Sequence, residues 1–292
     1  MVSHPMPCLG ALLEQEVLDA VYAYTERDTM LYALATGMAR DPLDESELDF
    51  VYERRSALKS VPTQALMVAR HDLIYKVGLN VDMFLHGEQV LTIHQPMPAS
   101  AELRAHHRVI NVIDRGCGRG LLIETESTVR LTSGTPLFDV YDLIFARGDG
   151  GLGGTGRPAR LAHAMPTRAP DIVRRISTER WQALLYHAVA GDRSGIHSEP
   201  DLARQAGFPA PILHGSCTMG LACGQVLAHA CGYDPARMRS FGARFTAVMY
   251  PGENLEVQMW LDGTTVSFRC RVPDRDVTVL DHGRSELVQK EH

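Results

Sequence analysis

The sequence lacks the features that mark several specialised protein classes. Its six cysteines include no pair spaced two residues apart, which argues against a structural zinc site and against a disulfide framework. No stretch approaches the roughly 20 consecutive apolar residues of a membrane span. No Lys or Arg precedes Arg27, so a secretory signal is not expected either. We therefore expect a cytoplasmic protein with reduced thiols that does not contact membranes.

The sequence also lacks a large excess of positive or negative charge. The 292 residues include 29 Lys and Arg against 35 Asp and Glu, for a formal net charge of −6. A mildly acidic chain is not an expected partner of nucleic acid. Hydrophobic residues make up 45% of the sequence, an ordinary globular proportion that excludes disordered and collagen-like proteins.

A segment rich in glycine and proline, residues 148–170, divides the chain. It is typical of a linker or a long surface connection, and it separates an N-terminal part, 1–147, from a C-terminal part, 171–292. The segment contains a G-x-G-x-x-G pattern that formally matches a dinucleotide-binding motif. The prolines that follow leave no room for the helix that such a motif needs at its last glycine. We therefore reject a nucleotide site here.

The two parts resemble each other. Residues 32–37 match residues 186–191, and an apolar helix candidate follows at a nearly constant offset, opening at Pro62-Thr63 in one part and at His214-Gly215 in the other. Such a repeat indicates a duplicated fold.

Each part is predicted to contain one principal helix and several strands. The second-half helix runs from Leu213 to Cys231 with Gly232 as its C-cap, and its residues are small or apolar on all sides, so it should be buried. Alternating patterns predict strands at 105–113, 119–131 and 137–146, and at 241–249, 255–261, 264–272 and 277–288. Consecutive hairpins form an antiparallel sheet, and a helix apolar on all sides must be wrapped by it. We predict an α+β fold, the hot-dog architecture present twice.

Asp192 and His197 are the candidate catalytic pair. A carboxylate and an imidazole held together can position one water and move a proton at neutral pH. The repeat places Met38 and Leu43 at the equivalent first-half positions, so the fold itself does not require the polar pair. Gly215 opens the buried helix, where a free N–H at the positive end of the helix dipole can stabilise an oxyanion.

These motifs resemble a known family. Residues 186–197 together with Phe208-Pro-Ala-Pro-Ile-Leu-His-Gly-Ser-Cys-Thr-Met-Gly220 are similar to the hydratase 2 signature of MaoC-like (R)-specific enoyl-CoA hydratases. Further segments resemble the substrate-binding half of the double hot-dog members of that family: Phe84-Leu-His-Gly-Glu-Gln89, Asp114-Arg-Gly116, residues 148–154 and Arg244-Phe245.

The resemblance implies reversible hydration of a trans-2-enoyl-CoA to a (3R)-3-hydroxyacyl-CoA, with no metal and no redox cofactor, coenzyme A entering only as part of the substrate. Asp192, His197 and the Gly215 N–H would carry the reaction, with Ser194 in support. The residues expected to contact the acyl group or its coenzyme A portion are His86, Gly87, Arg115, Arg193, Gly195, Ile196 and Phe245. A homodimer is also expected.

Two replacements set this chain apart from the family pattern. The family has Asn and Pro where this chain has Ser194 and Gly195; a hydroxyl is shorter than an amide, and glycine loosens a loop. Two other functions therefore stay open: acyl-CoA thioester hydrolysis, with Cys217 as a conceivable nucleophile, and acyl-CoA binding without turnover.

Four further side chains have simpler expected roles. His214 is expected to hydrogen-bond locally, and Tyr186 to anchor the loop in the core. His106 and His107 are adjacent in a predicted strand, so they should point to opposite faces and cannot form a paired metal site.

Overall fold

The computed structural model describes residues 8–54, 57–153, 156–157, 160–192 and 194–289. Its strands form one ten-stranded antiparallel sheet in the order β1-β3-β4-β5-β2-β7-β10-β9-β8-β6. In chain order the strands are β1 (Glu16–Tyr24), β2 (Phe84–Ile93), β3 (Ala101–Asp114), β4 (Leu121–Leu131), β5 (Pro136–Ala146), β6 (Ile172–Ser177), β7 (Met238–Phe245), β8 (Asn254–Asp262), β9 (Thr265–Val272) and β10 (Val277–Leu287).

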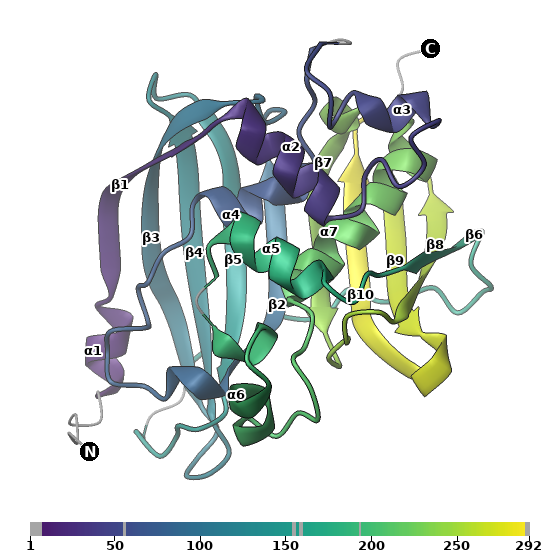
Figure 1. Ribbon diagram of the computed structural model, residues 1–292. Helices are drawn as coiled ribbons and strands as arrows, with labels where there is room; N and C mark the ends of the chain where they lie inside the picture. The colour runs from purple at the N-terminus through teal and green to yellow at the C-terminus, as the bar shows by residue number, and fades with distance from the viewer. Residues whose placement is uncertain (1–7, 55–56, 154–155, 158–159, 193, 290–292) are drawn as a thin grey trace.

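The longer helices lie together on one face of this sheet (Figure 1). The α-helices are α1 (Leu9–Leu13), α2 (Glu26–Ala35), α3 (Glu45–Leu48), α4 (Ala65–Val68), α5 (Gln182–Ala190), α6 (Pro200–Gln205) and α7 (Gly215–Val226). Short 3-10 turns are η1 (Pro62–Gln64), η2 (Val81–Met83), η3 (Gly195–His197), η5 (Pro235–Arg237) and η6 (Pro273–Arg275), and η4 (Leu227–Cys231) is a π-helical turn. None of the helices in the described parts of the chain combines the length and apolar character needed to cross a bilayer.

The sheet consists of two five-stranded halves with matching topology. The order β1-β3-β4-β5-β2 in one half corresponds to β6-β8-β9-β10-β7 in the other, as a duplicated α+β fold predicts. The halves join edge to edge where β2 pairs with β7. Arg244 Nε lies 2.8 Å from an oxygen of the buried Glu88 carboxylate across this junction. The two halves therefore share one continuous set of backbone hydrogen bonds.

The structure contains the buried helix that was predicted for the second half. Gly215–Val226 continues into the π-helical turn, and Gly232 ends the helix in the left-handed conformation with φ +62°. Most residues of α7 are buried, because the sheet covers one side and η1, together with the C-terminal end of α2, covers another. Gly220 and Gly224 allow close packing against Thr36 and Met38 just beyond α2.

The first-half helix is much shorter than predicted. The segment that corresponds to α7 is only the turn η1 followed by α4, and the chain leaves helical geometry at Ala69, with φ −119° and ψ 50°. Arg70, His71 and Asp72 follow directly. Because the helix ends here, all three polar side chains lie at the wall of a cavity instead of inside a packed helix, where burying them would be costly. The first half therefore lacks the central helix that fills the second half.

Several elements were not predicted, among them the strands β1 and β6 and the helices α2 and α5. The repeated segments 32–37 and 186–191 prove to be the ends of α2 and α5, which pack against each other with the Tyr32 and Tyr186 rings 6.1 Å apart. Tyr186 is fully buried, in agreement with its predicted place in the core. The strand β7 ends at Phe245, before the end of the strand predicted over 241–249.

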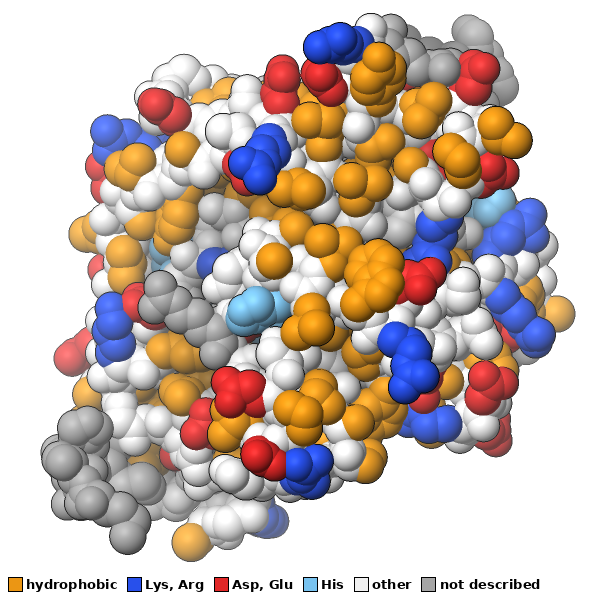
Figure 2. Space-filling model, viewed as in Figure 1, with side chains coloured by type: hydrophobic (Ala, Val, Ile, Leu, Met, Phe, Trp, Pro, Cys, Tyr) orange, Lys and Arg blue, Asp and Glu red, His pale blue; other side chains and the backbone are white. Residues whose placement is uncertain are grey.

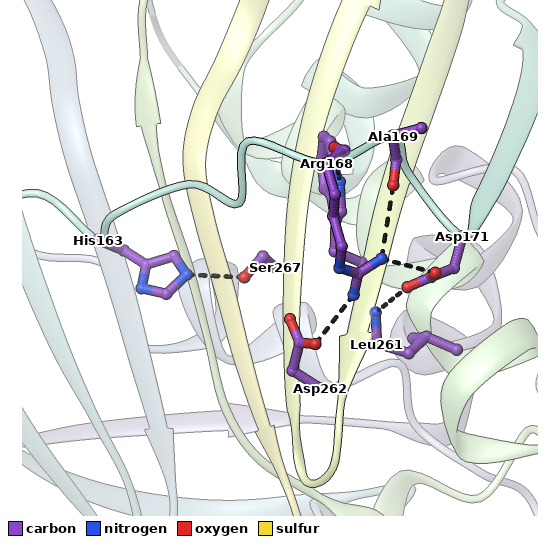
Figure 3. Close-up of polar contacts among 8 residues, drawn as sticks. His163, Arg168, Ala169, Asp171, Leu261, Asp262 and Ser267 are labelled. Carbon is purple, nitrogen blue, oxygen red and sulfur yellow. Dashed lines mark hydrogen bonds and ion pairs between the residues drawn. The ribbon is translucent and has the colours of Figure 1, made fainter.

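The connection between the halves is a surface segment held to the second-half sheet. Arg168 lies 2.6 Å from Asp171 and 2.9 Å from Asp262, and Leu261 N–H donates to Asp171 (Figure 3). His163 bonds the hydroxyl of Ser267 at 2.8 Å. Ser267 lies between two core residues of β9, so this contact is on the face of the sheet opposite α7.

The G-x-G-x-x-G pattern is not a nucleotide site. No helix follows it in the described residues between Gly148 and Asp171. Backbone N–H groups of Gly151 and Gly153 donate instead to the carboxylate of Asp114, and these bonds hold the pKa of Asp114 below its usual range.

Two glycines of α7 should respond oppositely to alanine. A Cβ at Gly220 would lie 2.3 Å from the Thr36 methyl group, whereas at Gly224 it would lie 3.3 Å from the flexible end of Met38. We expect Gly220→Ala to lower the free energy of unfolding by about 1–3 kcal/mol through overpacking. Gly224→Ala should be neutral or raise it by up to about 1 kcal/mol, because alanine favours helix.

Denaturant unfolding of both variants and the parent protein measures the difference. Equal destabilisation by the two changes would contradict the packing described for α7.

Candidate active site

A cavity of about 990 Å³ lies between the two halves. Its first-half wall includes Met67, Val68 and Phe84, in the region that a full central helix would occupy. Its second-half wall includes Asp192 and His197. The early end of α4 therefore opens space directly beside the predicted catalytic pair.

Asp192 is held as a carboxylate by the chain around it. It follows Gly191, which ends α5 with φ +62°. Ser194 N–H donates to one carboxylate oxygen at 2.9 Å, and Arg70 Nη2 lies 3.2 Å from the other. Burial raises the pKa of Asp192, but Arg70 and the Ser194 N–H outweigh it and leave the pKa below its usual value. Asp192 is therefore ionised at neutral pH.

His197 lies in the turn η3 with one ring nitrogen already used. Its Nδ1–H donates to the carbonyl of Ile212 at 2.9 Å, and Ile212 N–H donates back to the carbonyl of Ile196 at 3.1 Å. This tautomer leaves Nε2 with a free lone pair. Burial lowers the pKa of His197, so the ring is a neutral base at physiological pH.

His214 completes the cluster in a way that the sequence did not predict. Its ring stacks on His197 with centroids 3.8 Å apart, and neither of its nitrogens has a hydrogen-bond partner among the described residues. We expected a local hydrogen bond, and that prediction is wrong. Burial, followed by the neighbouring His197, lowers the pKa of His214 to about 2. Because the ring is neutral, its 4.0 Å separation from Asp192 is not an ion pair.

The same three residues have the ligand atoms of a metal site. One atom from each of Asp192, His197 and His214 lies within 4.8 Å of the others, and carboxylate and imidazole are common ligands of transition metals. The Arg70 guanidinium already neutralises the carboxylate. The absence of a metal from the reaction stays a prediction.

Gly215 begins α7 at the cavity wall, where its N–H has no acceptor within the helix. A Cβ here would lie 2.7 Å from the ring of Phe245, so only glycine lets the aromatic ring approach the helix so closely. Phe245 in turn packs edge to face against His86, with centroids 6.0 Å apart. Gly215 thus lines the cavity beside an aromatic wall, and its role as an oxyanion donor stays a prediction.

The structure brings most of the other predicted contact residues to the same cavity. The lining includes His86, Gly87, Ser194, Gly195, Ile196 and Phe245. Gly87 lies at a β-bulge, where the pairing of β2 with β5 shifts register. Gly195 is tightly packed, since a Cβ would lie 2.2 Å from Leu202. Glycine at this position therefore accommodates the packing of Leu202, which the sequence did not indicate.

Two predicted contact residues are placed differently. Arg115 is exposed in the loop between β3 and β4, and its guanidinium stacks on Phe145 at 5.4 Å, behind the cavity wall rather than in it. Arg193 lies outside the described residues. Their contacts with substrate stay predictions.

Sequence reasoning missed Arg70 and Arg147. Arg70 contacts Asp192 although the two are far apart in the chain, and no local pattern signals such a contact between halves. Arg147 lines the cavity and stacks on Phe208 at 5.6 Å. Its position directly before the glycine-rich segment was the available signal, since a cation at a cavity rim suits phosphate.

Cys217 is a core residue. Its side chain is fully buried in α7, and burial raises the pKa of its thiol. A thiol that stays protonated is a poor nucleophile, so the cysteine mechanism considered for thioester hydrolysis has no support.

Comparison with known proteins gives two family matches that together span most of the chain. Residues 22–148 match the MFE-2 hydratase 2 N-terminal domain, and residues 162–281 match the MaoC like domain. A Dictyostelium discoideum protein named "Probable enoyl-CoA hydratase 2" is 32% identical, covering 93% of this chain and 94% of its own. The Arabidopsis thaliana protein "Enoyl-CoA hydratase 2, peroxisomal" is 34% identical, covering 92% of each chain.

The fold has close structural neighbours as well. A MaoC-like dehydratase from Phytophthora capsici superposes with a TM-score of 0.82 at 30% identity, covering 96% of this chain and 98% of its own. This similarity confirms the predicted double hot-dog fold.

The buried imidazole of His214 should make stability depend on pH. In the unfolded chain it takes up a proton below about pH 6.5, whereas in the folded protein it stays neutral down to about pH 2. Between these values the unfolded state binds about one more proton, so stability is lost as the pH falls. We expect His214→Phe to make the loss between about pH 6 and pH 4 shallower by about 1.4 kcal/mol per pH unit.

Denaturant unfolding across this pH range measures the slope. His94→Phe, the same change at a partly exposed histidine, is the control. A slope unchanged by His214→Phe would show that this ring is protonated in the folded protein.

Proposed function

The chain belongs to the hydratase 2 family of MaoC-like enzymes, and on that premise we propose that it reversibly hydrates trans-2-enoyl-CoA to (3R)-3-hydroxyacyl-CoA. The observation that carries the proposal is the convergence of an ionised Asp192, a neutral His197 with a free Nε2 and the Gly215 N–H on one cavity. Each of these groups supplies a different part of a hydration.

The pair of Asp192 and His197 would hold the reacting water. The carboxylate accepts one hydrogen bond from the water, and the free Nε2 accepts the other. The water oxygen adds to C3 of the enoyl group, and the proton it releases passes through this pair to C2 on the same face. Neutral His197 and ionised Asp192 are the protonation states that this step requires.

Gly215 would stabilise the charge that develops during addition. As the C–O bond forms at C3, electron density moves to the thioester oxygen, where a backbone N–H can donate to it. A donor placed in this way contributes about 3–4 kcal/mol in comparable sites. The ring of Phe245 packs beside Gly215 and lines the same cavity.

Ser194 supports the carboxylate through its backbone. The family's Asn is replaced here, but the N–H of Ser194 bonds Asp192 irrespective of its side chain. The remaining predicted contacts with the acyl group or coenzyme A are His86, Gly87, Arg115, Arg193, Gly195 and Ile196, to which we add Arg147 at the cavity wall.

The proposal includes a division of labour between the halves. Residues 171–292 would carry the chemistry, 1–147 would accommodate the acyl chain, and 148–170 would connect them. The short helix of the first half and a cavity lined by both halves support this division. A space of about 990 Å³ also supports bulky or long acyl groups.

The proposal extends to location and assembly. All six cysteines are free thiols, which supports a reducing cytoplasmic location. The edge strand β1 exposes Leu18 and Val21, and an unpaired apolar edge supports pairing with a second copy as a homodimer. Sedimentation velocity tests the dimer.

Replacing either member of the pair should nearly abolish hydration. We expect Asp192→Asn and His197→Ala each to lower kcat by at least about 100-fold, since each removes a proton acceptor. Loss of absorbance at the enoyl-thioester band with crotonyl-CoA and a medium-chain trans-2-enoyl-CoA measures the rate. Oxidation of the product by a dehydrogenase specific for (3R)-hydroxyacyl-CoA checks its configuration.

Chemically matched controls come from the exposed pair of Asp139 and His94, 2.8 Å apart on the surface. Asp139→Asn and His94→Ala should keep the parent activity. Thiol release from a saturated acyl-CoA would instead favour thioester hydrolysis. Calorimetric binding without any loss of the enoyl band would favour a binding protein.

A further inference from the structure

A small polar side chamber of about 80 Å³ adjoins the main cavity in the first half. The two spaces share wall residues, among them Arg70, His71, His86 and Asp192. An acyl chain that extends from the reacting carbons into the first half therefore passes the opening of this chamber. The chamber is too small for a chain but large enough for a substituent on one.

The chamber exists because the first-half sheet is polar on its inner face. Gln89 on β2, Asp142 on β5 and Thr125 on β4 are register partners and form one row of side chains across three strands. Ser127 lies two residues beyond Thr125 on the same face. The row stops at the junction of the halves, where Ala243 on β7 is the partner of Gln89.

The second-half sheet serves as an internal comparison. Its inner face is apolar, formed by core side chains: Phe241, Ala243, Val257, Met259, Phe268 and Cys270. Buried polar groups reduce stability unless they find partners. The duplicated fold therefore does not need the polar row in the first half.

One atom of this row has no partner. The Gln89 side-chain amide donates from Nε2 to Asp142 at 2.7 Å, which fixes the orientation of the amide. Its Oε1 is left without a hydrogen bond, although Gln89 is only 4% exposed and lines the chamber. A buried, unpaired acceptor on a residue in a cavity wall requires a donor, which a ligand or a water can supply.

Other walls of the chamber supply hydrogen-bonding capacity. His71 Nδ1 accepts from the backbone N–H of Leu73 at 3.4 Å, and burial lowers the pKa of this imidazole. The neutral ring therefore carries its proton on Nε2, as a donor. Ser127 bonds His107 at 2.8 Å and, as a hydroxyl, retains capacity for a further hydrogen bond.

His107 on β3 is the register partner of Ser127 and is held in place by hydrogen bonds. It is fully buried, and Tyr22 bonds its Nε2 at 3.0 Å. The adjacent His106 faces outward to Glu16, so the two histidines point to opposite faces as predicted. The His107 ring also packs against the His71 ring, with centroids 4.5 Å apart and the ring planes tilted by 43°. The polar wall is thus rigidly supported.

We propose that the side chamber is a specificity subsite for a hydroxyl group on the acyl chain, beyond C3. A hydroxyl both donates and accepts, so it can donate to Gln89 Oε1 while it accepts from His71 or Ser127. A ketone can only accept, and a methyl group does neither. This inference rests on the proposed hydratase function, and it names the class of substrate that the first half selects.

The test compares medium-chain trans-2-enoyl-CoA substrates that carry one hydroxyl, moved along the chain beyond C3, with the unsubstituted parent and with keto analogues. At the position that reaches the chamber, we expect the wild type to show a kcat/KM about 10-fold above the parent value, the effect of one or two neutral hydrogen bonds. Gln89→Leu should remove this preference while its kcat/KM for the parent stays within about 3-fold of wild type. Gln95→Leu, the same change just beyond β2, should leave the preference intact.

Several results would overturn the proposal. The first is a wild type that treats hydroxylated and parent substrates alike at every position, which would mean that the chamber holds water only. The second is a preference for the keto analogues. The third is Gln89→Leu lowering kcat/KM equally for both substrates, which would mean a structural role. If Gln89→Leu does not fold, Ser127→Ala replaces it with the same expectation.

Failure of the hydratase proposal is a separate result. It would appear as no loss of the enoyl band with the parent substrate in the wild type. Hydration of the parent keeps that proposal intact whatever the hydroxyl series shows.

Discussion

Much of this structure depends on where the first-half helix stops. The chain leaves helical geometry at Ala69 and continues with Arg70 and His71. Because the helix stops early, the region that a longer helix would occupy in the first half becomes part of the cavity. It also brings a guanidinium to 3.2 Å from Asp192, and this cation, together with the Ser194 N–H, lowers the pKa of the buried carboxylate. One local feature of the backbone therefore provides both the space for a substrate and the charge state of the residue beside it.

Much of the architecture follows from sequence patterns, because those patterns are local. The apolar helix with Gly232 at its end, the alternating strands and the repeat each reflect interactions between near neighbours in the chain or a period that the fold imposes. Asp192, His197 and Gly215 were also predicted, since they lie on a loop and a helix start with a recognisable motif. Ile212, three residues before Gly215, helps to hold His197 close to the start of α7, because its carbonyl accepts from His197 and its N–H donates to Ile196.

The features that escaped prediction arise between segments far apart in the chain. No local pattern places Arg70 beside Asp192, or the ring of His214 against His197 without a hydrogen bond. The length of the first-half helix was overestimated because the repeat implied symmetry. Duplication preserves the strand order, yet each copy is free to lose an element that the other still needs. The apolar face over α2 and α5, where Leu34, Trp181 and Leu184 are exposed, likewise gave no signal in the sequence; Figure 2 views the molecule from this side.

The pairing of β2 with β7 limits how far the two halves can move relative to each other. Two domains connected only by a linker can move apart to admit a ligand. Here the two halves are joined by five register pairs of β2 with β7, from Glu88–Arg244 to Thr92–Ser240. Separating them would break backbone hydrogen bonds along the whole seam. A thioester must therefore enter a cavity whose sheet framework is nearly fixed. Any widening of the cavity entrance then requires movement of the loops around it.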